Sequence, residues 1–180
     1  MVWLIIVLVI GLMLSPMLWL RPNPRQRRVG RLRTAAMEAG IEVKLEEPPL
    51  HDAGKMASYR WSYPSEYPGP RFVLVREGAA GQSLKSFGDG WRWRIEPLRA
   101  LPEALLTRLE GVLQALPPDA MVVESSRGAL TLWWGESLDC DAFEAPRQRL
   151  TELQDQLAGR PDQPAPRKLG FREMRDETRR

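Results

Sequence analysis

A run of nineteen residues without a charge, residues 2–20, is the feature that most limits what this chain can fold into. As a helix the run would be about 28 Å long, which nearly matches a bilayer's hydrocarbon core about 30 Å thick. Trp3 and Trp19 lie at its two ends, where an indole ring can keep its N–H near the lipid headgroups. The run therefore predicts a transmembrane anchor over residues 1–20.

A basic segment, residues 21–33, follows the anchor and contains six arginines and no acidic residue: Arg21, Arg25, Arg27, Arg28, Arg31 and Arg33. A cleaved leader would need positive charge before the apolar run and small residues at a cleavage site, and neither is present. By the positive-inside rule these arginines set the topology, with the N-terminus outside and the remaining chain in the cytoplasm. Since most basic residues are Arg, as in high-GC bacteria, we expect a single-pass protein in the lipid bilayer of a bacterial inner membrane.

The charge of the chain is unevenly distributed. Residues 34–159 hold 13 basic and 19 acidic residues, a net charge of −6, whereas both flanks are basic. Since an acidic body is not attracted to phosphates, no nucleic acid is expected as a partner.

The stretch Leu20-Arg21-Pro22, followed by Arg25-Gln26-Arg27-Arg28, resembles the juxtamembrane segment of YajC-type accessory subunits of the Sec translocase. Those proteins also have one N-terminal span and a small cytoplasmic part. The Gly-Asp-x-Val and Gly-Gly-Ile pattern of that family does not follow here, where the chain continues with GRLRTAAMEAGIEVKLEE. The resemblance implies an accessory role in a secretion or envelope machine, exerted through the transmembrane helix.

The rest of the chain alternates between strand and helix patterns. Period-two alternation predicts strands at 41–45, 57–63, 71–77, 91–97, 121–125 and 129–135, and apolar stripes predict helices at 29–39, 102–116 and 142–158. Because short loops join most strands, we expect an α+β domain over 34–159, with a mainly antiparallel sheet of about six strands and three helices on one face. The charged, Pro-containing residues 160–180 predict a disordered tail.

Few residues are suited to catalysis. One cysteine, Cys140, and one histidine, His51, exclude an intrachain disulfide and a cysteine-based zinc site, and they leave few nucleophile–base pairs. The glycine-rich stretch 78–86 has Leu84 where a phosphate-binding loop needs glycine before Lys-Ser. We therefore predict no catalytic residue and no cofactor.

Three carboxylates gather before the last predicted helix: Asp139, Asp141 and Glu144. They could hold a divalent cation. The spacing of Asp141 and Glu144 is also typical of helix capping, and acidic residues suit a helix N-terminus. We favour the cap and predict no metal site.

Three tryptophans mark a possible partner surface. Trp133 and Trp134 are adjacent in a predicted strand, so their side chains must lie on opposite faces of the sheet. Together with Trp61 they could form an exposed aromatic groove that binds a protein. The alternative is that a helix or the tail covers them.

These observations favour a membrane-tethered, non-catalytic protein-interaction module. Two alternatives stay open: the YajC-like accessory role, and an enzyme with an unrecognised carboxylate site.

Overall fold

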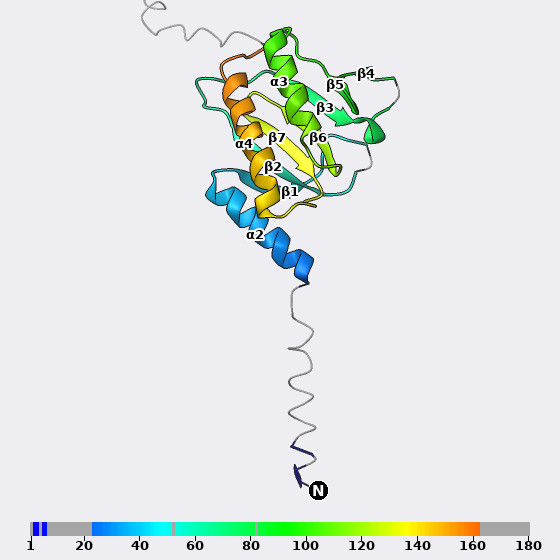
Figure 1. Cartoon of the computed structure of the whole chain (residues 1–180), viewed down its shortest axis with the longest axis vertical. Helices are drawn as coiled ribbons and strands as arrows, with labels where there is room; N and C mark the ends of the chain where they lie inside the picture. The colour runs from blue at the N-terminus through cyan, green and yellow to red at the C-terminus, as the bar shows by residue number, and fades with distance from the viewer. Residues whose placement is uncertain (1, 4, 7–22, 52, 82, 163–180) are drawn as a thin grey trace, which may run out of the picture.

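One antiparallel sheet with helices on one face organises the part of the chain that the computed structural model describes, residues 2–3, 5–6, 23–51, 53–81 and 83–162 (Figure 1). The helices are α2 (Pro24–Glu38), α3 (Glu103–Gln114) and α4 (Cys140–Leu157), with a short 3-10 turn, η1 (Glu77–Ala79). The strands are β1 (Glu42–Glu46), β2 (Met56–Ser62), β3 (Phe72–Arg76), β4 (Lys85–Ser86), β5 (Trp91–Ile95), β6 (Ala120–Ser125) and β7 (Ala129–Trp134).

The strands lie in the order β1-β2-β7-β6-β3-β5-β4, and every pair is antiparallel. The hairpin of β6 and β7 occupies the middle of the sheet, and β1 and β4 form its two edges. Because consecutive side chains of a strand alternate between faces, this order gathers the inward residues of β2, β7 and β3 on the helix side.

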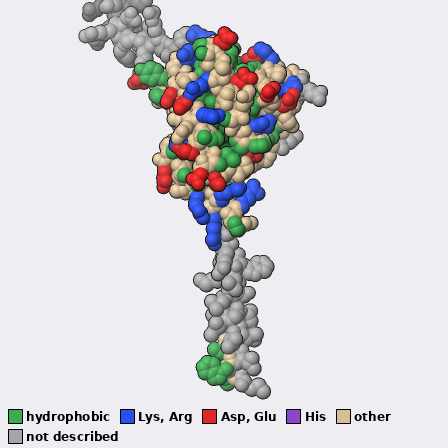
Figure 2. All heavy atoms as spheres, viewed as in Figure 1, with side chains coloured by type: hydrophobic (Ala, Val, Ile, Leu, Met, Phe, Trp, Pro, Cys, Tyr) green, Lys and Arg blue, Asp and Glu red, His purple; other side chains and the backbone are tan. Residues whose placement is uncertain are grey.

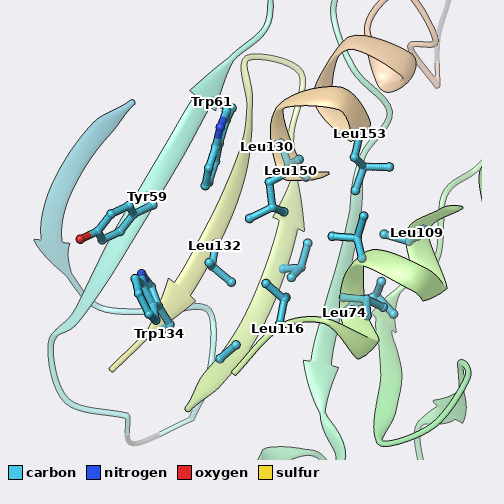
Figure 3. Close-up of a cluster of buried hydrophobic side chains, with 14 of the residues drawn as sticks. Tyr59, Trp61, Leu74, Leu109, Leu116, Leu130, Leu132, Trp134, Leu150 and Leu153 are labelled. Atoms are coloured by element: carbon cyan, nitrogen blue, oxygen red, sulfur yellow. The ribbon is translucent and has the colours of Figure 1, made fainter. Parts of the chain in front are cut away.

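The main core fills the space between the sheet and the helices (Figure 3). Trp61 of β2 and Leu130 of β7 project toward Leu150 and Leu153 of α4, and Leu109 of α3 lies over Leu74 of β3. The apolar stripes of α3 and α4 therefore pack against the sheet, as their helical spacing predicts.

A second, smaller apolar cluster lies on the reverse face of the sheet. Val73, Val75, Val122 and Trp133 are buried there. Side chains of the loops beside the sheet pack against them, among them Leu50 before β2 and Ala79 and Ala80 after β3. The reverse face is therefore covered by loops and the 3-10 turn η1 rather than by α-helices.

Helix α2 begins earlier than its apolar spacing predicts. Pro24 is its first residue, where a fixed φ favours helix and no N–H is lost. Asn23 and Gln26 form a capping box with each other's backbone N–H groups, so the helix starts inside the arginine-rich segment. Leu32 and Ala36 are the residues of α2 that are buried against the domain.

The fold class predicted from the sequence is wrong in two respects. The sheet has seven strands rather than about six, because Lys85–Ser86 adds a two-residue strand beside β5. No helix formed by the described residues has both the length and the apolar composition needed to cross a bilayer. Residues 1, 4 and 7–20 of the expected anchor lie outside the described residues, and the part that is described gives no support to the predicted single-pass inner-membrane location.

Candidate functional site

Glu136 lies at the centre of a partly buried polar cluster between α2 and the sheet. Its carboxylate accepts two hydrogen bonds from Arg33 of α2, from Nε to Oε1 at 2.7 Å and from Nη2 to Oε2 at 2.6 Å. The hydroxyl of Tyr59, on β2, donates to Oε1 at 2.9 Å. We call Arg33, Tyr59 and Glu136 the Glu136 cluster; it connects α2 to the sheet through a bidentate, charge-assisted contact.

The backbone holds Glu136 in an unfavourable conformation. Its φ is +59°, a left-handed angle that side chains other than glycine adopt at a cost of about 1 kcal/mol or more. The flanking residues fix the loop, because Gly135 N–H donates to the carbonyl of Asp119 and Ser137 N–H donates to its carboxylate. The loop thereby directs the Glu136 side chain beneath α2.

Hydrogen bonding, burial and charge shift the pKa values of Arg33 and Tyr59. The hydrogen bond to Glu136 raises the pKa of Arg33, so the guanidinium group of Arg33 stays positively charged. Burial raises the pKa of the Tyr59 phenol, and the charge of Glu136 raises it further. Tyr59 is therefore a permanent hydrogen-bond donor at neutral pH. Since both carboxylate oxygens are occupied, the cluster is built to position α2 rather than to transfer a proton.

The raised phenol pKa predicts alkaline destabilisation. Burial also raises the pKa of Tyr63, just after β2. Because both phenols lose their protons more readily in the unfolded chain, the free energy of unfolding should fall above pH about 10, by up to ~1.4 kcal/mol per pH unit for each phenol. Urea unfolding on both sides of this pH should show a shallower decline for the Tyr59→Phe/Tyr63→Phe double variant than for the native chain or for Tyr67→Phe, whose ring is exposed. An identical decline in all three proteins would contradict the prediction.

A groove of about 560 Å³ lies beside the Glu136 cluster. The residues that line it come from α2, from its N-cap and from the loop after β7: Asn23, Arg25, Gln26, Val29, Gly30, Arg33, Gly135 and Glu136. The end of the domain formed by α2 is strongly basic, as the Lys and Arg side chains in Figure 2 show. Of the charged residues that line the groove, Arg33 and Glu136 pair with each other, whereas Arg25 forms no ion pair with a described residue.

The basic surface of α2, which we define as Arg25, Arg27, Arg28 and Arg31, is not explained by packing. Arg28 donates to the carbonyl of Glu136 at 3.5 Å, whereas Arg25, Arg27 and Arg31 are exposed. None of these four side chains forms an ion pair with a residue that the structure describes.

These arginines cost the helix stability. The first turn of α2 has no acidic residue, although negative charge is favoured at that end of a helix. Arg27 and Arg31 are four residues apart, and like charges at that spacing destabilise a helix by about 0.2–0.5 kcal/mol. The helix N-terminus is already capped by Asn23, so the available chemistry lies in the guanidinium groups.

The predicted aromatic partner surface does not exist in this structure. Trp61, Trp133 and Trp134 are only 5%, 5% and 0% exposed. Trp133 and Trp134 do face opposite sides of the sheet, as alternation requires, but both sides are covered. Trp134 stacks on Phe143 of α4 with ring centroids 4.8 Å apart, and Trp61 donates its indole N–H to Thr151 at 3.1 Å. The helices thus cover two of the three rings and the loops cover the third.

The residues predicted to anchor the chain and to set its membrane topology do not form one site among the described residues. Trp3 is described and exposed, whereas Trp19 and Arg21 lie outside the described residues. Arg25, Arg27 and Arg28, expected to set membrane topology, lie on α2.

Of the three carboxylates, Asp139 directly precedes α4, whereas Asp141 and Glu144 lie within the helix. Asp139 is the N-cap of α4 and accepts from Ala142 N–H at 2.9 Å, so the cap lies two residues before the predicted Asp141. Glu144 pairs with Arg147. Within the described ranges no group of three or more His, Cys, Asp and Glu is placed to hold a metal ion.

No protein family, curated protein or solved structure matches this chain. The resemblance to YajC-type subunits stays a prediction. Sequence reasoning missed Glu136, because no local pattern marks a single acidic residue after a strand as the partner of an arginine 103 residues away.

Proposed function

We propose that this chain is a non-catalytic protein-interaction domain that holds an acidic segment of a partner protein on the basic surface of α2. The observation that carries the proposal is the set of exposed arginines without an ion-pair partner among the described residues. A partner's carboxylates would relieve the repulsion within α2 and would pair with guanidinium groups in bidentate geometry.

The contacts that hold α2 against the domain support this proposal. Leu32 and Ala36 are buried against the domain, and the hydrogen bonds of the Glu136 cluster connect the helix to the loop after β7. A helix held in this way presents its arginines in a constant arrangement, so less conformational entropy is lost on binding.

The charge of the whole domain supports the same site. Residues 34–159 carry a net charge of −6, so most of the domain repels an acidic segment. Attraction is concentrated at α2, which favours one docking position over dispersed contacts.

A binding measurement tests the proposal. Fluorescence anisotropy of a labelled oligo-glutamate peptide should show salt-sensitive binding to the full chain. The triple variant Arg25→Gln/Arg27→Gln/Arg31→Gln should weaken binding by roughly 3- to 150-fold, because each of the three exposed ion pairs contributes about 0.2–1 kcal/mol. The matched control replaces Arg94, Arg99 and Arg127 with Gln, an equal loss of charge from exposed positions outside α2.

Two outcomes would contradict the proposal. Equal weakening by the α2 variant and its control would show that only net charge matters. Tighter binding of single-stranded DNA with the same number of charges, at the same salt concentration, would indicate a nucleic acid rather than an acidic protein segment.

A further inference from the structure

Strand β1 is an open edge of the sheet. β2 pairs with it on one side, and no described strand pairs with it on the other. An edge strand presents a row of backbone N–H and C=O groups that can pair with another strand. The opposite edge, β4, has two residues, whereas β1 has five, so β1 is the longer template.

The side chains of β1 divide into a charged and an apolar set. Glu42, Lys44 and Glu46 project to one face, and Val43 and Leu45 project to the other. Val43 packs against the helix-side core, but Leu45 is 56% exposed. A large apolar side chain on an open edge is a liability unless something covers it.

Whether the charged set is complementary to itself depends on the antiparallel register. If Lys44 lay opposite Lys44 of a second copy, Glu42 would face Glu46 and every charged pair would repel. If instead Leu45 lies opposite Leu45 of the second copy, Lys44 faces Glu46 and Glu46 faces Lys44. This register forms two ion pairs across the junction and brings the two exposed leucines together.

A competing register would place Val43 opposite Val43 and Lys44 opposite Glu42. The carboxylate of Glu42 already has two cationic neighbours in its own chain, Nζ of Lys44 at 2.6 Å and Nε of Arg60 at 3.9 Å. Among the described residues, the carboxylate of Glu46 accepts only from the hydroxyl of Ser58. That register also leaves Leu45 opposite the buried Ile41. The Leu45-centred register therefore pairs the charged and apolar side chains of the two copies better.

We infer that two copies of this chain associate through β1, antiparallel and about a two-fold axis at Leu45, so that their sheets join into one. The occupant of the open edge is a second copy of the chain. This inference rests on the edge and its charges alone, and it is independent of the function proposed for α2.

Charge exchange tests the inference most directly. In sedimentation velocity, the native chain should show a concentration-dependent dimer. Lys44→Glu places a second carboxylate opposite Glu46, and Glu46→Lys places a second ammonium group opposite Lys44, so each variant alone should dimerise at least about tenfold more weakly. An equimolar mixture of the two variants should recover the dimer, because every cross-pair is then opposite in charge.

Controls separate this outcome from misfolding. Lys85→Glu makes the same charge change on the opposite edge strand, where Lys85 pairs with Glu96, and should leave dimerisation unchanged. Thermal melting of Lys44→Glu should resemble that of the native chain, since the side chains of Lys44 and Glu42 are both about half-exposed.

A cross-link reports the register. In a Cys140→Ser background, Leu45→Cys should oxidise to a covalent dimer, whereas Leu98→Cys, at another exposed position, should not. A native chain that stays monomeric at all concentrations, a mixture that fails to form the mixed dimer, or equal cross-linking at both positions would overturn the inference.

Discussion

Replacing Gly69 with alanine should destabilise the fold by about 3 kcal/mol, the upper range for overpacking a buried site. A Cβ atom at Gly69 would lie 2.3 Å from Cε2 and 2.5 Å from Cζ of Tyr63, well inside contact distance. The ring cannot move freely, because it is buried and its hydroxyl is hydrogen-bonded to Ser125 Oγ at 2.9 Å. Ser125 in turn donates to the carbonyl of Pro70 at 2.6 Å, so a displaced ring also disturbs the backbone beside Gly69.

Urea unfolding measures this prediction, and Gly111→Ala is the matched control. Gly111 lies within α3 with nothing within 4 Å of an added Cβ, so alanine there should stabilise the fold by about 0.5–1 kcal/mol. In a Tyr63→Ala background the cost of Gly69→Ala should largely disappear, since the clashing ring is gone. A Gly69→Ala variant as stable as the native chain would refute this account of the contact.

Replacing Glu136 with leucine should cost about 2–4 kcal/mol of unfolding free energy. The substitution leaves Arg33 without its carboxylate and leaves the buried hydroxyl of Tyr59 without its acceptor. The estimate lies below that for a fully buried pair, because the Arg33 side chain is 36% exposed and water can solvate part of its charge.

A double-mutant cycle distinguishes a stranded charge from lost packing. Arg33→Met/Glu136→Leu should be more stable than Glu136→Leu alone, since no unpaired charge remains. Glu144→Gln, which breaks the exposed pair with Arg147, should leave the free energy of unfolding almost unchanged. Equal costs for Glu136→Leu and Glu144→Gln would contradict the positioning role of the Glu136 cluster.

Local patterns located the long strands and helices of the domain. Period-two alternation predicted a strand at 57–63, and β2 spans Met56–Ser62; an apolar stripe predicted a helix at 102–116, and α3 spans Glu103–Gln114. These elements are long enough for their periodicity to be visible. β4 was missed because two polar residues, Lys85 and Ser86, carry no alternation and pair with β5 only in the assembled sheet.

The start of α2 shows how one pattern can favour two structures. The sequence predicts that residues 21–33 form a basic segment that follows a transmembrane anchor. Pro24 instead begins a helix, because Asn23 and Gln26 cap it. The capping spacing is present in the sequence, but the apolar run before it favoured the interpretation of residues 21–33 as a segment beside a membrane anchor.

The sequence by itself determined the alternation of strands and helices, the opposite orientation of Trp133 and Trp134, and the uneven distribution of charge. These properties depend on neighbouring residues and on simple counts. Only the tertiary structure decided that loops cover the reverse face, that Glu136 meets Arg33 and Tyr59, and that β1 is left as an open edge. Each of these depends on contacts between residues far apart in the chain, and strand order and loop placement are not encoded in any local period.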